Sequence, residues 1–120
     1  MIAAITTTKG GFWWAAGIAG VCMGSSQSAG RALADAAGAQ YVLHASAAAS
    51  YAFKGVQDGD VLELGNVAIR VMHTPGHTPG LCCLYLAKEQ VFFTSDHILF
   101  DITPNIQVWY HMKQAMQCYL

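Results

Sequence analysis

Short apolar runs alternate with tight-turn sequences over the second half of the chain, and this alternation constrains the fold more than any other feature. The runs are residues 60–64, 67–73, 82–87 and 91–94. Gly65-Asn66 separates the first two, and a two-residue loop of this kind is typical of a β-hairpin. Val67, Ile69 and Val71 share one face of the second run, because successive side chains of a strand point to opposite sides. We therefore predict a hairpin followed by two further strands.

Helical patterns precede and follow these strands in the sequence. Ser28 can cap a helix that ends at Gly38. Its apolar stripe is Ala29, Ala32, Leu33 and Ala36. Residues 40–44 are strand-like, and the alanine-rich residues 45–53 predict a short helix. A last helix is expected after Pro104, with a core-facing stripe. That stripe is Trp109, Met112, Met116 and Leu120. Helices and strands in alternation indicate an α/β fold.

The composition excludes several classes of protein. Hydrophobic residues make up 54% of the chain and charged residues 11%, so neither a disordered segment nor a coiled coil fits. Six lysines and arginines stand against seven acidic residues, which leaves no basic surface for nucleic acid or for an anionic membrane. So few charges leave much apolar surface to cover. We therefore expect self-association.

The N-terminal residues 1–27 form a divergent apolar stretch, and residues 28–120 form the domain-like part. The apolar run within this stretch is shorter than the roughly 20 residues of a membrane span. A cleaved signal segment, and hence an exported small protein, is the alternative. The chain contains four cysteines but no Cys-x-x-Cys pair, and this usage indicates reduced thiols in the cytoplasm.

Two places carry the chemistry. His77 lies between two Pro-Gly pairs in the sequence HTPGHTPG of residues 73–80, directly after a predicted strand. Pro-Gly pairs favour tight turns, so the loop would hold the imidazole in one place. Asp96 lies in the second place, the sequence FFTSDH of residues 92–97, a buried-looking strand that ends in a carboxylate. Neutral imidazole and carboxylate oxygen are both ordinary zinc ligands. His77 and Asp96 are therefore the candidate metal ligands.

These motifs resemble the metallo-β-lactamase superfamily, in its glyoxalase II-like hydrolase branch. Residues 59–65 resemble that family's strand before a ligand loop, and residues 74–78 resemble the loop that carries a histidine ligand. Residues 94–97 resemble the strand end whose aspartate bridges two metals, with Ser95 in place of the usual glycine. Residues 101–106 match a segment common in one hydrolase subgroup.

The resemblance implies a partial αβ/βα sandwich, with a mixed sheet and flanking helices. It also implies two zinc ions and metal-dependent hydrolysis of a small ester-type substrate. His77 would complete one coordination shell, and Asp96 would bridge the two ions. In such a site the metals lower the pKa of a bound water and polarise the substrate.

The sequence departs from the family where most of the ligands should lie. The signature His-x-His-x-Asp-His is expected just before the helix near Ser28, but residues 21–28 read VCMGSSQS. The last histidine ligand of the family would fall beyond Leu120. We therefore expect an incomplete domain, inactive as this chain. The alternative is a non-catalytic scaffold remnant, or half of a split protein, without bound metal.

Other metal-ligating residue types have structural interpretations as well. His73 lies on a strand face and is expected to be packed or hydrogen-bonded. His97 is either a supporting residue beside the ligand position or a structural histidine. Cys82 and Cys83, on opposite faces of a strand, are expected to be small packing residues, with soft metal ligation as the alternative.

Overall fold

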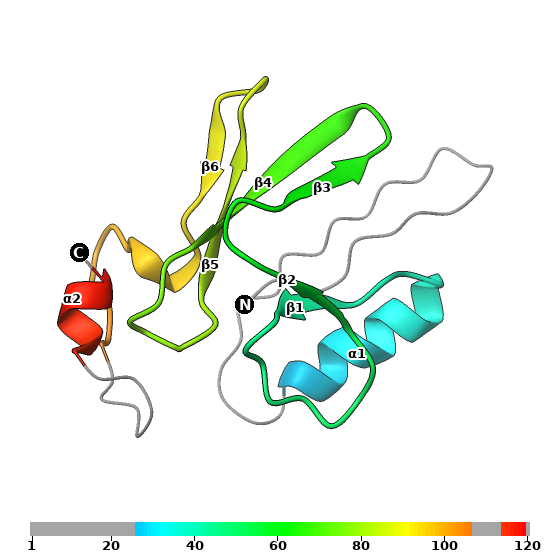
Figure 1. Cartoon of the computed structure of the whole chain (residues 1–120), viewed down its shortest axis with the longest axis horizontal. Helices are drawn as coiled ribbons and strands as arrows, with labels where there is room; N and C mark the ends of the chain where they lie inside the picture. Colours follow the sequence, from blue (N-terminus) through cyan, green and yellow to red (C-terminus); the bar gives the residue numbers. More distant parts are fainter. Residues whose placement is uncertain (1–25, 107–113, 120) are drawn as a thin grey trace.

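The computed structural model describes residues 26–106 and 114–119 (Figure 1). Its elements are α1 (Ser26–Ala37), β1 (Val42–His44), β2 (Lys54–Val56), β3 (Val61–Leu64), β4 (Val67–His73), β5 (Cys82–Leu86), β6 (Val91–Phe93), the 3-10 helix η1 (Ser95–His97) and α2 (Ala115–Tyr119). The predicted N-terminal stretch of residues 1–27 lies outside this range except for its last two residues. Among the described helices, none is long and apolar enough to cross a membrane.

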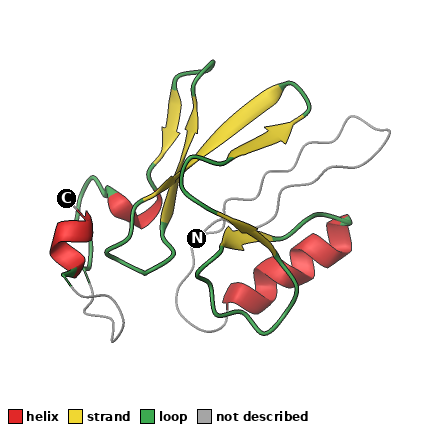
Figure 2. Cartoon of the chain, viewed as in Figure 1, coloured by secondary structure: helices red, strands yellow, loops and turns green. Residues whose placement is uncertain are grey.

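The larger sheet confirms the predicted strands. It has four antiparallel strands in the order β3-β4-β5-β6 (Figure 2). Leu64 pairs with Val67, so the hairpin loop is the predicted Gly65-Asn66. Gly65 has a φ of 64°, a left-handed conformation that costs glycine little. Ile69 and Val71 are buried and Val67 is half-buried on the shared face, because this face packs against the rest of the fold.

The smaller sheet pairs β1 with β2 in parallel, and no helix connects them. The predicted helix of residues 45–53 is therefore wrong. The Ala45 amide donates to the Val56 carbonyl, and the Ala47 amide closes a turn on His44. A parallel pair needs a connection that returns along the strand, and this segment is too short to contain both the return and a helix. Strand pairing thus overrides the alanine propensity.

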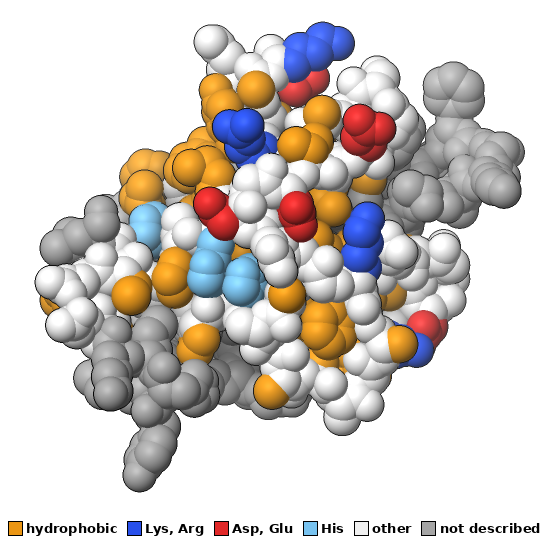
Figure 3. All heavy atoms as spheres, in the orientation of Figure 1, with side chains coloured by type: hydrophobic (Ala, Val, Ile, Leu, Met, Phe, Trp, Pro, Cys, Tyr) orange, Lys and Arg blue, Asp and Glu red, His pale blue; other side chains and the backbone are white. Residues whose placement is uncertain are grey.

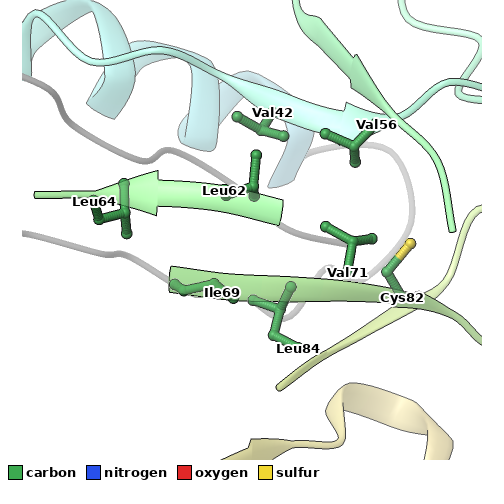
Figure 4. Packing of buried hydrophobic residues seen from close by; sticks show 8 residues of the cluster. All are labelled: Val42, Val56, Leu62, Leu64, Ile69, Val71, Cys82 and Leu84. Atoms are coloured by element: carbon green, nitrogen blue, oxygen red, sulfur yellow. The ribbon is translucent and has the colours of Figure 1, made fainter. Parts of the chain in front are cut away.

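Helix α1, the β1–β2 pair and the four-stranded sheet form three successive layers (Figures 1 and 4). Two consecutive residues of β1 belong to the two different interfaces between these layers. Val42 faces the larger sheet with Val56, whereas Leu43 packs with Tyr41 and Ala34 of α1. The sheet contributes Leu62, Leu64, Ile69, Val71, Cys82 and Leu84 to the first interface (Figure 4).

Helix α1 differs in detail from the prediction. It begins at Ser26, so Ser28 lies inside its first turn, and it ends at Ala37, where Gly38 takes a φ of 60°. Ala34 is buried, whereas Ala32 and Ala36 of the predicted stripe are exposed. Alanine is a weak apolar signal, because it is common on both the buried and the exposed sides of helices.

Helix α2 covers only part of the predicted C-terminal helix. Met116 is 58% exposed, so its assignment to the core is wrong. Ala115 is buried and Tyr119 half-buried instead, and residues four apart share a helix face. The other predicted stripe residues, Trp109, Met112 and Leu120, lie outside the described residues.

The edge strand β6 carries an apolar surface. Val91, Phe92 and Phe93 are each about 40% exposed, so the interpretation of residues 91–94 as a buried strand is wrong. The chain that follows adds Ile98, Phe100 and Ile102, which are more exposed still. Hydrophobic side chains gather over this part of the molecule in Figure 3. We call these six residues the β6 surface.

Candidate metal site

The loop of residues 74–81 joins β4 to β5 and carries His77. Its ends are fixed because His73 pairs with Cys82 and because the Thr74 amide donates to the Leu81 carbonyl at 3.0 Å. Within the loop, Gly76 is buried and has a φ of 149°, a backbone conformation that other residues rarely adopt. The sequence therefore builds a tight loop at this strand end, as the two Pro-Gly pairs predict.

His77 and Asp96 lie close together, although they follow different strands. Asp96 is in η1, directly after β6, and its Oδ2 lies 3.9 Å from His77 Nε2. The His77 Nδ1 atom lies 2.7 Å from the backbone oxygen of Asn105. A carbonyl oxygen only accepts hydrogen bonds, so Nδ1 carries the proton and Nε2 is directed to the carboxylate side. An orienting bond of this kind is typical of metal-ligating histidines.

The two donors fit zinc in kind but not in number. Two ligands of one tetrahedral zinc ion, each bonded at about 2.0–2.2 Å, lie roughly 3.4 Å apart, so a small closure would bring this pair into range. A catalytic zinc ion needs three protein ligands. Among residues 26–106 and 114–119, no group of three or more histidine, cysteine, aspartate or glutamate side chains is placed to hold a metal. The described residues therefore hold no complete zinc site.

The cysteines next to this loop do not supply the missing donors. Both Cys82 and Cys83 are buried, and burial raises the pKa of Cys82 to about 11 and raises that of Cys83 as well. The Cys83 thiol donates to the Thr94 carbonyl at 3.2 Å, and that of Cys82 is 3.6 Å from the Gly80 carbonyl. Thiolates are the metal-binding form, so neutral buried thiols match the predicted packing role.

His73 is hydrogen-bonded, as predicted. Its Nε2 donates to the Pro79 carbonyl at 2.8 Å, and its backbone amide donates to Asp58 Oδ1 at 2.8 Å. His97 lies against Tyr119 with ring centroids 4.5 Å apart, and its buried Nδ1 has no hydrogen-bond partner among the described residues. Neither imidazole is grouped with His77 and Asp96 as a third metal donor.

A stacked pair of histidines near the loop is a feature that the sequence did not reveal. The rings of His44 and His73 are 3.8 Å apart and nearly parallel, and histidine side chains gather on the face shown in Figure 3. The Ser46 amide donates to His44 Nδ1 at 3.2 Å, so that nitrogen carries no proton. The pair thus joins the end of β1 to the base of the His77 loop.

This pair predicts a loss of stability at acidic pH. Burial, followed by the neighbouring His73, lowers the pKa of His44, while Asp58 opposes the shift. A lowered pKa means that folding favours neutral His44. The contribution of His44 to the free energy of unfolding is therefore complete above the unfolded-state pKa of about 6.5, and it declines as the pH falls below that value.

Urea unfolding at several pH values tests this prediction. We expect the urea concentration at the unfolding midpoint to decrease when the pH is lowered from about 7.5 to about 5. His44→Phe keeps a stacked ring but cannot be protonated, so its midpoint should decrease less over the same range. His97→Phe is the matched control and should keep the slope. An identical slope in the His44 and His97 variants would contradict the assignment.

The comparisons with known proteins identify the family. The sequence model of the metallo-beta-lactamase superfamily matches residues 11–116, which is most of the chain. The chain belongs to this superfamily.

Individual relatives match shorter segments. A hydroxyacylglutathione hydrolase from Chelativorans sp. (strain BNC1) is 49% identical over 58 residues, covering 42% of this chain and 23% of the relative. An acyl-coenzyme A thioesterase from Homo sapiens is 41% identical over 46 residues, covering 38% of this chain and 16% of the relative. An uncharacterised protein from Aquifex aeolicus (strain VF5) is 54% identical over 41 residues, covering 34% and 19% of the two chains. The chain thus spans about a fifth of the length of these curated relatives.

A solved structure supports the fold class. The crystal structure of a metallo-beta-lactamase family protein from Thermus thermophilus superposes with a TM-score of 0.54 at 30% identity. The match covers 57% of this chain and 23% of that one. The mixed parallel and antiparallel sheets with few helices agree with a partial αβ/βα sandwich, so the predicted fold class is confirmed.

Proposed function

We propose that this chain carries two ligands of a metallo-beta-lactamase-type zinc centre, His77 and Asp96, and has no hydrolase activity on its own. The observation that carries the proposal is the pairing of His77 Nε2 with Asp96 Oδ2 at 3.9 Å, with Nδ1 engaged by the Asn105 carbonyl. This arrangement gives Nδ1 a hydrogen-bond acceptor and directs Nε2 towards the Asp96 carboxylate. It supports a ligand role for both residues.

The donor count supports the absence of activity. Water becomes a nucleophile near neutral pH only when a firmly held metal lowers its pKa. Two donors alone would hold a metal weakly and exchangeably, too loosely to activate a water in this way. The second candidate is a scaffold remnant, or half of a split protein, without metal. The same lack of a third donor among the described residues favours it.

The named relatives and the thiols of this chain support a substrate class and a location. Two relatives are named hydroxyacylglutathione hydrolase and acyl-coenzyme A thioesterase. These names favour a small ester-type substrate for the complete site, with a thioester as the first candidate. Cys82 and Cys83 are free thiols buried in the fold, which favours a reducing, cytoplasmic location. The low net charge gives no support to nucleic acid or a membrane as partner.

Turnover assays test the proposal. The purified chain, with excess zinc, is assayed on thioester, lactone and phosphodiester substrates beside His77→Ala, Asp96→Ala and the control Asp101→Ala, an exposed acid outside the pair. We expect rates at background for all four proteins. Zinc-dependent turnover that disappears in the His77 and Asp96 variants but persists in the control would contradict the inactive assignment.

A further inference from the structure

Tyr119 of α2 contacts the neighbours of both proposed ligands. Its hydroxyl donates a hydrogen bond to the backbone oxygen of His97, the residue after Asp96, and its ring lies against the His97 ring. On the other side, Tyr119 packs on Gly76, the residue before His77. A Cβ atom added to Gly76 would lie only 2.9 Å from Tyr119 Cβ and Cδ2.

The two ligand loops are also connected through the hydrogen bond between His77 Nδ1 and the Asn105 carbonyl and through Cys83, whose thiol lies between Thr74 and Thr94. They follow β4 and β6, which lie on either side of β5 and are not neighbours in the sheet. Each loop therefore follows its own strand, and Tyr119 is a further contact that joins the two loops. A side chain that touches both backbones fixes their separation, because close packing leaves little room for independent movement.

We propose that Tyr119 is a positioning residue for the metal-binding pair: it clamps the backbone at Gly76–His77 against the backbone at Asp96–His97 and so sets the separation of His77 Nε2 and Asp96 Oδ2. The inference rests on the proposed role of His77 and Asp96 as ligands. Gly76 is part of the device, because its missing side chain lets the tyrosine approach. Its φ of 149° adds a second reason for glycine at this position.

Cobalt(II) titration of the full chain, followed by the visible absorption of the bound ion, tests the clamp without reference to turnover. Tyr119→Phe removes only the hydrogen bond to His97 and should weaken cobalt binding about threefold. Tyr119→Ala also removes the packing and should weaken it about tenfold or more, the scale found for partners that orient metal ligands. Tyr85→Phe, in the sheet beside Phe92, is the matched control and should bind as the unaltered chain does.

Urea unfolding of Tyr119→Phe separates positioning from a general loss of structure. Positioning predicts an unfolding midpoint equal to that of the unaltered chain together with weaker cobalt binding. Gly76→Ala completes a double-mutant cycle. Gly76→Ala should weaken cobalt binding more in the chain that keeps Tyr119 than in the chain that also carries Tyr119→Ala. In the second chain the clash with the tyrosine ring is absent, and only the backbone strain at position 76 remains.

Three results would overturn the clamp. The first is that the unaltered chain does not bind cobalt. The second is that the Tyr119 variants and the control bind cobalt with equal affinity. The third is that the effects of Gly76→Ala and Tyr119→Ala on cobalt binding are strictly additive. None of them concerns turnover. Zinc-dependent hydrolysis would overturn the proposed lack of activity and leave the clamp to its own test.

Discussion

Leu84→Ala should lower the free energy of unfolding by about 2–5 kcal/mol, the range for a buried leucine whose cavity cannot fully collapse. Leu84 is 3% exposed and lies on the inner strand β5, where Val71 and Phe93 are its partners in the strand register. A domain of this size is stable by about 5–15 kcal/mol, so the loss is a large part of the total.

Urea denaturation of this variant beside Lys88→Ala gives the measurement. Lys88 is exposed in the turn between β5 and β6, and truncating it should change the free energy of unfolding by less than about 0.5 kcal/mol. Equal losses in the two variants would mean that the β1–β2 pair does not pack on the larger sheet as described.

Self-association through the β6 surface is the second large effect that we expect. β6 is an edge strand, and edge strands with apolar side chains favour contact with another chain. Phe100→Lys combined with Ile102→Lys places two charges on this surface at positions 97% and 68% exposed, so the fold should tolerate them. Removing two such apolar side chains from a contact should weaken association by at least about tenfold.

Light scattering over a concentration series measures the change in mass. Ala36→Lys, at an exposed position on α1 away from β6, is the matched control and should associate like the unaltered chain. A monomeric unaltered chain at all concentrations, or equal association of the double variant and the control, would contradict a role for the β6 surface.

The sequence predicts the parts of the fold that depend on neighbouring residues. The hairpin at Gly65-Asn66 is one, because loop length and alternation set its register without help from the rest of the chain. The helix expected over residues 45–53 fails because a non-local interaction, the parallel pairing of β1 with β2, decides that segment. Met116 fails for a related reason, since periodicity gives the faces of a helix but not the face that finds a neighbour.

The candidate site divides in the same way. The proximity of His77 and Asp96 was expected from the resemblance of their two loops to a known family, and the structure places them together. The stacking of His44 on His73 and the contacts of Tyr119 were not expected, because they join segments far apart in the chain with no motif to mark them. Local patterns therefore indicate the two proposed ligands, whereas the contacts that support them depend on tertiary packing.

Zinc titration of the purified chain against a competing chelator tests the central claim most directly. Structural zinc sites bind with at least about 10 kcal/mol, which corresponds to dissociation constants tighter than about 0.1 µM. With His77 and Asp96 as its described donors, the chain should bind zinc more weakly than about 1 µM, and both His77→Ala and Asp96→Ala should abolish the binding. Tight one-to-one binding, or binding that survives both substitutions, would contradict an incomplete site built on this pair.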